Sequence, residues 1–172
     1  AVTARVAKAA SAALQAYFKS GSPPFYFPRA RAYGEADCEP ALTQGQLDMP
    51  PIIGPCEVTY KPWPTDSFPT WFTVNEWDKF VHYAVTPDCS DVTGTCTSTA
   101  GTIVVTGIPT PVPAVVIVTG RALSPPRATV IQARPCAIAA DCLDDPRNAD
   151  GSSPFARPDA ASNDRLEVVP IP

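Results

Sequence analysis

Apolar side chains recur every three or four residues along the first twenty residues of the chain. The stripe consists of Val2, Val6, Ala9, Ala10, Ala13, Leu14 and Tyr17. Basic and amide side chains fall on the other side, which is the pattern of an amphipathic helix. Alanine favours a helix locally, and Gly21 followed by prolines stops one. The pattern therefore predicts a helix from about Val2 to about Lys19.

The start of this helix lacks an ordinary cap. A Ser, Thr, Asp or Asn usually precedes the apolar pattern, but here the pattern is already running at Ala1 and Val2. We therefore expect the chain to begin inside a longer helix.

Residues 21–78 show hardly any regular period, which predicts a long loop region. A loop of this length needs contacts of its own, and large aromatic side chains are available as anchors. These are Phe25, Tyr26, Phe27, Tyr33, Tyr60, Trp63, Phe68, Trp71, Phe72 and Trp77. We expect them to form a satellite core over the helix or the sheet.

Short runs of β-forming residues follow from Lys79 onward. KFVHYAVT at 79–86 predicts a strand, GTIVVTG at 101–107 the strand that returns, and AVVIVTG at 114–120, the most apolar run, the central strand. Sequential strands with short connections favour an antiparallel sheet. A last short strand is predicted from Arg165.

Together these elements predict an α+β fold in one domain over residues 1–172. A helix at 1–20 packs on a three- to four-stranded antiparallel sheet at 79–120, after the long loop region at 21–78. Residues 121–172 form a disulfide-bounded C-terminal loop and the last strand.

Composition excludes several classes of protein. The net charge of −4 arises from 13 basic and 17 acidic residues, and the basic ones are scattered, so no nucleic-acid-binding patch is indicated. The 22 prolines favour turns and extended connections. The longest apolar run, at 113–118, is far shorter than the roughly 20 residues of a membrane span.

Six cysteines indicate disulfides rather than a metal site. The chain has no C-x-x-C and one histidine, which disfavours structural zinc. Six cysteines allow about 15 pairings, and neighbours in sequence are the simplest choice. The pairs are Cys38 with Cys56, Cys89 with Cys96, and Cys136 with Cys142. Such bridges, worth about 2–4 kcal/mol each, point to an oxidising compartment, periplasmic or extracellular.

Catalytic chemistry finds little support in the residues. His82 is the one histidine, and its place among apolar neighbours predicts a packed or hydrogen-bonded structural role. Neither G-x-S-x-G nor a phosphate-binding glycine motif occurs. The interpretation is that the protein is not an enzyme.

An acidic cluster is the one candidate cofactor site. Asp141, Asp144, Asp145 and Asp150 lie on a Gly- and Asn-bearing loop that could wrap Ca²⁺. The spacing does not match an EF-hand loop and Arg147 interrupts it, so a solvated acidic loop is the alternative. No other cofactor is indicated.

Four local phrases resemble those of prepilin-like proteins of Gram-negative bacteria. They are Tyr33–Cys38 (YGEADC), Asn75–Val85 (NEWDKFVHYAV), Ala114–Gly120 (AVVIVTG) and Asn163–Val168 (NDRLEV). The family pattern is D-x-W-G-x-x-x-x-Y-A-V, then A-V-V-I-x-x-G, then a closing N-D before a short apolar strand. Asp78 stands where the family has glycine, and the family's leader and apolar half-helix do not occur in this sequence.

The resemblance is to the soluble part of a type IV pilin or pseudopilin. It implies a minor pilin or pseudopilin-like structural subunit of a type IV pilus or a type II secretion pseudopilus. The implied partners are other pilin subunits and the inner-membrane assembly platform, with membrane contact only through the missing half-helix. The implied location is the inner membrane before assembly, then a periplasmic or extracellular filament. The isolated domain is expected to be monomeric.

A function of another class fits the aromatic residues. Trp63, Trp71 and Trp77 would be the stacking faces of a secreted recognition module that binds carbohydrate or peptide. Burial of these tryptophans would remove that platform.

Overall fold

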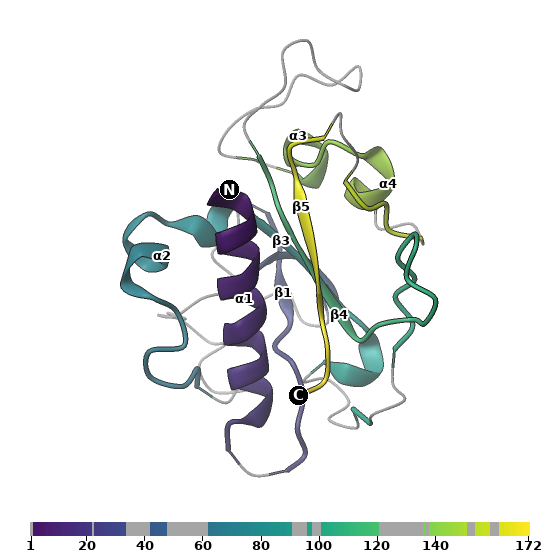
Figure 1. The fold of residues 1–172 in the computed structure, drawn as a ribbon. Coiled ribbons are helices and arrows are strands. Elements are labelled where there is room, and N and C mark those ends of the chain that lie inside the picture. The colour runs from purple at the N-terminus through teal and green to yellow at the C-terminus, as the bar shows by residue number, and fades with distance from the viewer. Residues whose placement is uncertain are drawn as a thin grey trace.

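A computed structural model describes residues 2–21, 23–33, 42–47, 62–90, 96–97, 101–120, 136, 138–150, 154–158 and 162–172. The long first helix is followed by strands with short helices between them (Figure 1). The elements are α1 (Val2–Lys19), β1 (Ala30–Arg31), β2 (Gln44–Leu47), α2 (Thr70–Val74), η2 (Trp77–Phe80), β3 (Val81–Val85), η3 (Pro87–Cys89), β4 (Ala114–Val118), α3 (Ala139–Cys142), α4 (Pro146–Ala149) and β5 (Arg165–Val169).

The five strands form one antiparallel sheet in sequential order, β1-β2-β3-β4-β5. The register pairs Tyr83 with Val116 and Val116 with Glu167. β4 is an interior strand paired on both sides, whereas β3 takes the middle place in the order. The predicted α+β class and the antiparallel pairing are thus confirmed.

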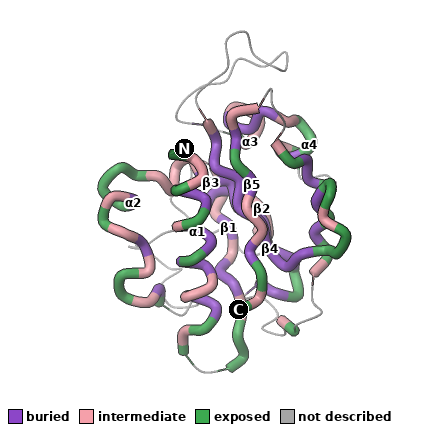
Figure 2. The backbone as a smooth tube through the Cα atoms, in the orientation of Figure 1, coloured by how far each residue is buried: buried purple, intermediate pink, exposed green. Residues whose placement is uncertain are grey.

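Both faces of the sheet are covered, which explains why every residue of β3 and β4 is buried. Alternate residues point to opposite faces of a strand. Tyr83 and Val116 face α1, whereas Ala84 and Ile117 join a second core with Phe155 and other residues of the C-terminal part. Figure 2 shows the resulting buried stretch through the middle of the molecule.

The first helix has the predicted bounds, Val2–Lys19. Val6, Ala10 and Leu14 are fully buried, and the helix contacts β4 and β5. Lys8 and Lys19 lie on the exposed side. The apolar stripe is therefore the surface that joins the helix to the sheet.

The predicted loop region at 21–78 is wrong in part, because it supplies two strands and α2. β2 has the sequence QGQL, which lacks the alternation that marks a strand. Its pairing depends on Gly45, where a Cβ would collide with the carbonyl oxygen of Arg31 on β1. The sheet consequently has five strands instead of three or four.

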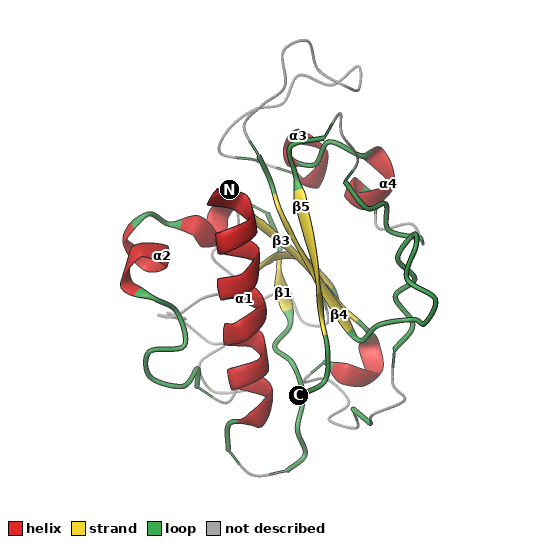
Figure 3. Cartoon of the chain, viewed as in Figure 1, coloured by secondary structure: helices red, strands yellow, loops and turns green. Residues whose placement is uncertain are grey.

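The predicted returning strand at 101–107 is also wrong. This segment makes only isolated bridges, Ile103 with Val112 and Val105 with Phe155, and joins no strand of the sheet. Ile103 and Val112 exchange two backbone hydrogen bonds, so the proline-rich segment folds back on its own chain. β3 therefore pairs directly with β4 (Figure 3).

Candidate functional site

Three of the resembling phrases meet where β4 ends. The register aligns Val81, Val118 and Arg165 across β3, β4 and β5. Residues just before β3, just after β4 and just before β5 therefore gather at one end of the sheet. They include Trp77, Phe80, Thr119, Gly120 and Asp164.

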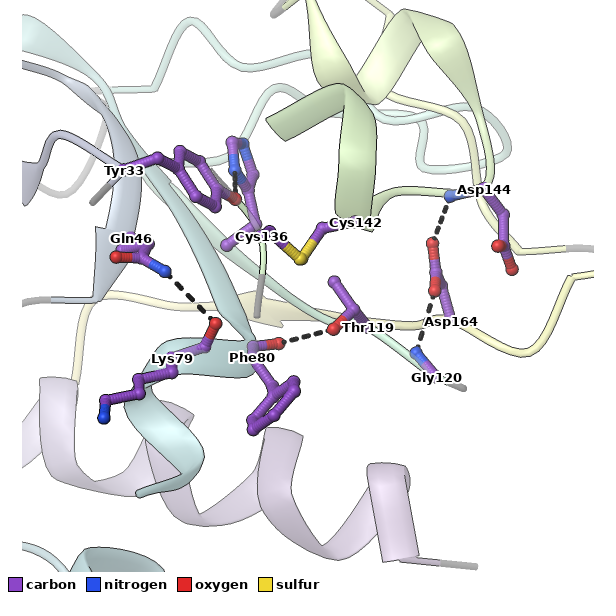
Figure 4. Close-up of a disulfide and its surroundings, with 11 residues drawn as sticks. Tyr33, Gln46, Lys79, Phe80, Thr119, Gly120, Cys136, Cys142, Asp144 and Asp164 are labelled. Atoms are coloured by element: carbon purple, nitrogen blue, oxygen red, sulfur yellow. Dashed lines mark hydrogen bonds between the residues drawn. A yellow bond between two sulfur atoms is a disulfide. The ribbon is translucent and has the colours of Figure 1, made fainter. Parts of the chain in front are cut away.

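Two buried aspartates fasten this end of the sheet (Figure 4). Asp164 accepts the backbone N–H of Gly120 at 3.0 Å and that of Asp144 at 2.7 Å. Asp144 accepts the backbone N–H of Asn163 and the hydroxyl of Ser162, both at 2.9 Å. Each carboxyl group therefore accepts two hydrogen bonds. We call Asp144 and Asp164 with these four donors the aspartate clasp.

Gly120 has no room for a side chain. A Cβ there would collide with the side chain of Asn163 and would lie 2.7 Å from its carbonyl oxygen. The glycine that closes the AVVIVTG phrase therefore allows the two chain segments of the aspartate clasp to approach.

Asn148 forms a second fastening beside the clasp. Its amide donates to the carbonyl of Ala156 at 3.0 Å and accepts the N–H of Ala156 at 2.7 Å. Gln44 of β2 donates to the backbone carbonyl of Asn148 at 3.3 Å. Asn148 is buried, and these bonds hold the α4 segment against Ala156 and against β2.

The four aspartates predicted to bind calcium have separate positions and contacts in the structure. Asp144 belongs to the aspartate clasp, and Asp145 accepts the N–H of Arg147 at the start of α4 and pairs with its guanidinium at 2.8 Å. Asp145 thereby raises the pKa of Arg147. Asp141 lies in α3, and Asp150 directly follows α4. Within the described ranges, no three His, Cys, Asp or Glu side chains are placed to hold a metal ion.

An open recess of about 300 Å³ lies beside the first turn of α1. Its lining is Val2, Thr3, Asn75, Trp77, Phe80, Thr119 and Gly120. The amide of Asn75 donates to the carbonyl of Trp71 at 2.6 Å, and Thr119 donates to that of Phe80 at 3.2 Å. These two donors are engaged within the chain, and the lining combines the apolar surface of Val2, Trp77 and Phe80 with the polar side chain of Thr3.

The three tryptophans have different surroundings. Trp63 is only 9% exposed and packs on Tyr17, with ring centroids 4.8 Å apart. Trp71 is half-buried, and the guanidinium of Arg5 lies 4.3 Å from its ring centroid. Trp77 is half-buried and lines the recess. Trp63 is therefore unavailable as a stacking face, and Arg5 covers part of Trp71.

His82 is buried on the face of the sheet opposite α1. Its Nδ1 lies 2.6 Å from the hydroxyl of Tyr33, whose ring stacks on the imidazole. Burial lowers the pKa of His82 to about 3, so the ring is neutral. Its Nε2 has no hydrogen-bond partner among the described residues.

Asp78, which departs from the glycine of the family pattern, lies beside β1. Its carboxylate is 3.7 Å from the guanidinium of Arg31. Burial raises the pKa of Asp78, and the positive charge of Arg31 acts in the opposite direction. Asp78 thus places an ion pair between η2 and β1.

Disulfides join Cys89 with Cys96 and Cys136 with Cys142. Cys38 and Cys56, the third neighbouring pair, lie outside the described residues.

Sequence reasoning did not find the contacts of Asp164, Asn148 and Gly120. In the sequence, each is only a polar residue or a glycine near an apolar run, and this local pattern does not show which distant residue it contacts.

No helix in the described part of the chain has both the length and the apolar character needed to cross a membrane. Compared with family models, curated proteins and solved structures, the chain gives no match in any of the three.

Proposed function

We propose that this protein is a minor pilin or pseudopilin-like structural subunit of a type IV pilus or a type II secretion pseudopilus. Its work is assembly, not catalysis. One observation carries the proposal: the segments that resemble prepilin-like proteins are bonded to one another, because Gly120 of one phrase donates to Asp164 of another.

The packing of α1 supports this function. Val6, Ala10 and Leu14 bury one side of the helix on β4 and β5, and Lys8 and Lys19 leave the other side exposed. An amphipathic helix packs its apolar stripe on the core of its own domain and leaves its polar side accessible. This arrangement suits a subunit that joins a filament through its N-terminal helix.

The cysteine pairs are consistent with the proposed location. Disulfides persist in oxidising compartments such as the periplasm and the extracellular space. Cys136 and Cys142 close a short segment directly before the aspartate clasp, which stabilises the C-terminal part against unfolding outside the cell. In this proposal the protein needs no cofactor, and its partners are other subunits and the inner-membrane assembly platform.

A recognition module is the weaker alternative. Trp63 is buried and Arg5 covers part of Trp71, so Trp77 in the recess is the one of the three with an accessible lining role. A single aromatic ring is a small platform for carbohydrate stacking.

The test is the mature form of the protein in its own cells. We expect a methylated aromatic N-terminal residue followed by a long apolar segment that leads into Val2, measured by mass spectrometry of the purified protein. We also expect the protein in the sheared filament fraction. A mature N-terminus at or near Ala1 after a cleaved signal peptide would contradict the proposal and favour the recognition module.

A matched pair of variants strengthens this test. Leu14→Ala damages the packing of α1 on the sheet, whereas Lys8→Ala changes only the exposed side of the same helix. If the helix must hold the folded domain to the filament, the first variant is lost from the filament fraction and the second is retained.

A further inference from the structure

β5 forms one edge of the sheet. The strand order ends at β5 on one side and at β1 on the other, and β1 has two residues whereas β5 has five. In Figure 1, β5 runs between α1 and the short helices α3 and α4, and no helix or strand is drawn across it. The outer side of an edge strand carries backbone N–H and C=O groups that another strand can bind. β5 is therefore the longer of the two edges at which a further strand could pair.

The hydrogen bonds between β3 and β4 show which residues of β4 face β5. Thr119 donates its backbone N–H to the carbonyl oxygen of Phe80 at 2.9 Å, and Thr86 donates to that of Pro113 at 2.8 Å. Residues 113 and 119, just before and just after β4, therefore bond toward β3. Successive residues of an antiparallel strand bond alternately to the neighbour on one side and to the neighbour on the other. The backbone groups of the even-numbered residues of β4 consequently point toward β5.

The register then fixes the outward groups of β5. Even-numbered residues of β4 lie opposite Arg165, Glu167 and Val169, so the backbone groups of these three residues point toward β4. The N–H and C=O groups of Leu166 and Val168 consequently point away from the sheet. Among the described residues, none forms a hydrogen bond with these outward groups. The edge thus offers two residues, spaced as a strand requires, for pairing with another chain.

Arg165 and Glu167 give this edge two opposite charges. Both residues point to the same face of the strand as Val169, which belongs to the core under α1. Arg165 is exposed and Glu167 is half-buried. Neither forms an ion pair with another residue in the described part of the chain. Both charges are therefore available to a partner strand.

Charge selects one way of pairing two copies of β5. In an antiparallel pair related by a two-fold axis, outward residues face outward residues, so the axis passes beside Leu166, Glu167 or Val168. An axis at Leu166 places Arg165 of each copy opposite Glu167 of the other, so every charge has a partner of opposite sign. An axis at Glu167 places two like charges opposite each other, and an axis at Val168 places Glu167 opposite Val169. The edge is complementary to itself in charge only in the first register.

We propose that β5 pairs with β5 of a second copy of this chain, antiparallel and with the two-fold axis at Leu166. The backbone of Leu166 exchanges hydrogen bonds with its counterpart, Arg165 pairs with Glu167 across the axis, and the two sheets become one continuous sheet. The pairing uses a single short strand, so the association is weak and the chain is monomeric when dilute. This inference goes beyond the proposed function, because the folded domain makes the contact without a filament.

The first test is sedimentation of the purified, disulfide-intact chain between about 10 µM and about 1 mM, the range in which weak contacts appear. We expect a monomer–dimer equilibrium. Glu167→Arg and Arg165→Glu each place like charges opposite one another and should each weaken the dimer by about tenfold or more. Asp88→Arg is the matched control, because Asp88 is an exposed aspartate outside β5 and its change in charge equals that of Glu167→Arg. The control should leave the equilibrium unchanged.

A mixture of the two single variants identifies the register. In Glu167→Arg both charged positions of β5 are arginine, and in Arg165→Glu both are glutamate. A mixed dimer with the axis at Leu166 therefore places every arginine opposite a glutamate. We expect the mixture to associate at concentrations at which each variant alone remains monomeric. Circular dichroism and thermal unfolding show that each variant remains folded.

Amide hydrogen exchange, measured by NMR, tests the backbone geometry. The N–H of Leu166 points outward in the monomer, whereas that of Glu167 points toward β4. Raising the concentration to about 1 mM should slow exchange at Leu166 as the dimer forms, and it should change exchange at Glu167 much less.

Several results would overturn the inference. A chain that stays monomeric at about 1 mM would do so and would leave this edge to an extended segment of another protein. So would a dimer that is insensitive to the single charge reversals, a mixture that associates no better than its components, or a dimer in which exchange at Leu166 is not slowed. None of these results bears on the filament proposal, which is tested separately by the mature N-terminus.

Discussion

The carboxylate of Asp164 accepts the backbone N–H of Gly120 at 3.0 Å, across a sequence separation of 44 residues. The bond joins the end of β4 to the start of β5, and the other oxygen of Asp164 binds the N–H of Asp144. One side chain thus ties three segments together. Because both donors are backbone groups, loss of the carboxylate would leave them without that acceptor.

Asp164→Ala should lower the free energy of unfolding by about 2–4 kcal/mol, since two donors lose their acceptor. Asp164→Asn keeps one carbonyl oxygen and should cost less. Urea unfolding followed by circular dichroism measures both variants. The control is Asp88→Ala, an exposed aspartate, which should stay within about 0.5 kcal/mol of the wild type. Equal stabilities for Asp164→Ala and Asp88→Ala would mean that the clasp is not a stabilising feature.

The buried position of Leu14 predicts a larger loss of folding stability. Leu14 is fully buried between α1 and the sheet, so Leu14→Ala should destabilise the fold by about 2–5 kcal/mol through lost burial and a cavity. Lys8→Ala on the exposed side of the same helix should change stability by less than about 0.5 kcal/mol. Thermal and urea unfolding provide the comparison. A small effect of Leu14→Ala would indicate that the helix is not an integral part of the core.

Stability should fall in acid because of His82. Its pKa is lowered to about 3 in the fold against 6.5 when unfolded, so between these values the unfolded chain binds a proton that the folded chain does not. The contribution is fully present above pH 6.5 and is lost as the pH falls toward 3. Each pH unit in this window costs up to about 1.4 kcal/mol.

The pH effect is isolated by comparison with His82→Phe. Carboxylates titrate in both proteins, so the difference between their urea-unfolding free energies at pH 7, 6, 5 and 4 reports His82. We expect the wild type to lose stability faster than the variant below about pH 6.5, the ordinary pKa of histidine. Parallel curves over this range would show that His82 titrates normally in the folded protein.

The bridge between Cys136 and Cys142 closes a short loop before the aspartate clasp. Replacing both cysteines by alanine should cost about 2 kcal/mol, the loop-closure value for so short a segment. Since the clasp also holds this segment, the double replacement combined with Asp164→Ala should depart from additivity. Chemical unfolding under oxidising conditions measures the free energy of unfolding of the wild type, of the two separate variants and of their combination. Strict additivity would show that the bridge and the clasp act independently.

The helix and three of the strands could be predicted because their signals are local. The stripe of α1 has a period of 3.6 over eighteen residues, and its bounds were predicted as Val2–Lys19. The runs that become β3, β4 and β5 are short, apolar and rich in β-forming residues, so they favour strands when a neighbouring strand is available for pairing.

The remaining elements depend on contacts that a linear pattern does not contain. QGQL becomes β2 because β3 offers free backbone groups and Gly45 allows Arg31 to approach. GTIVVTG has strand composition, but the direct pairing of β3 with β4 occupies the position between these two strands that the prediction gave it. Strand propensity is therefore overridden by the backbone hydrogen bonds that the fold makes available.

The candidate site likewise has features that the sequence determined and features that only the tertiary structure decided. Sequence alone determined which residue types were present: aspartates next to apolar runs, tryptophans in a proline-rich region, and a histidine inside a strand. Only the tertiary structure decided that Asp144 and Asp164 bind backbone N–H groups, that Trp63 is buried, and that His82 lies against Tyr33. The physical reason is that hydrogen bonds and burial are made between residues far apart in the chain, whereas periodicity reports only on neighbours.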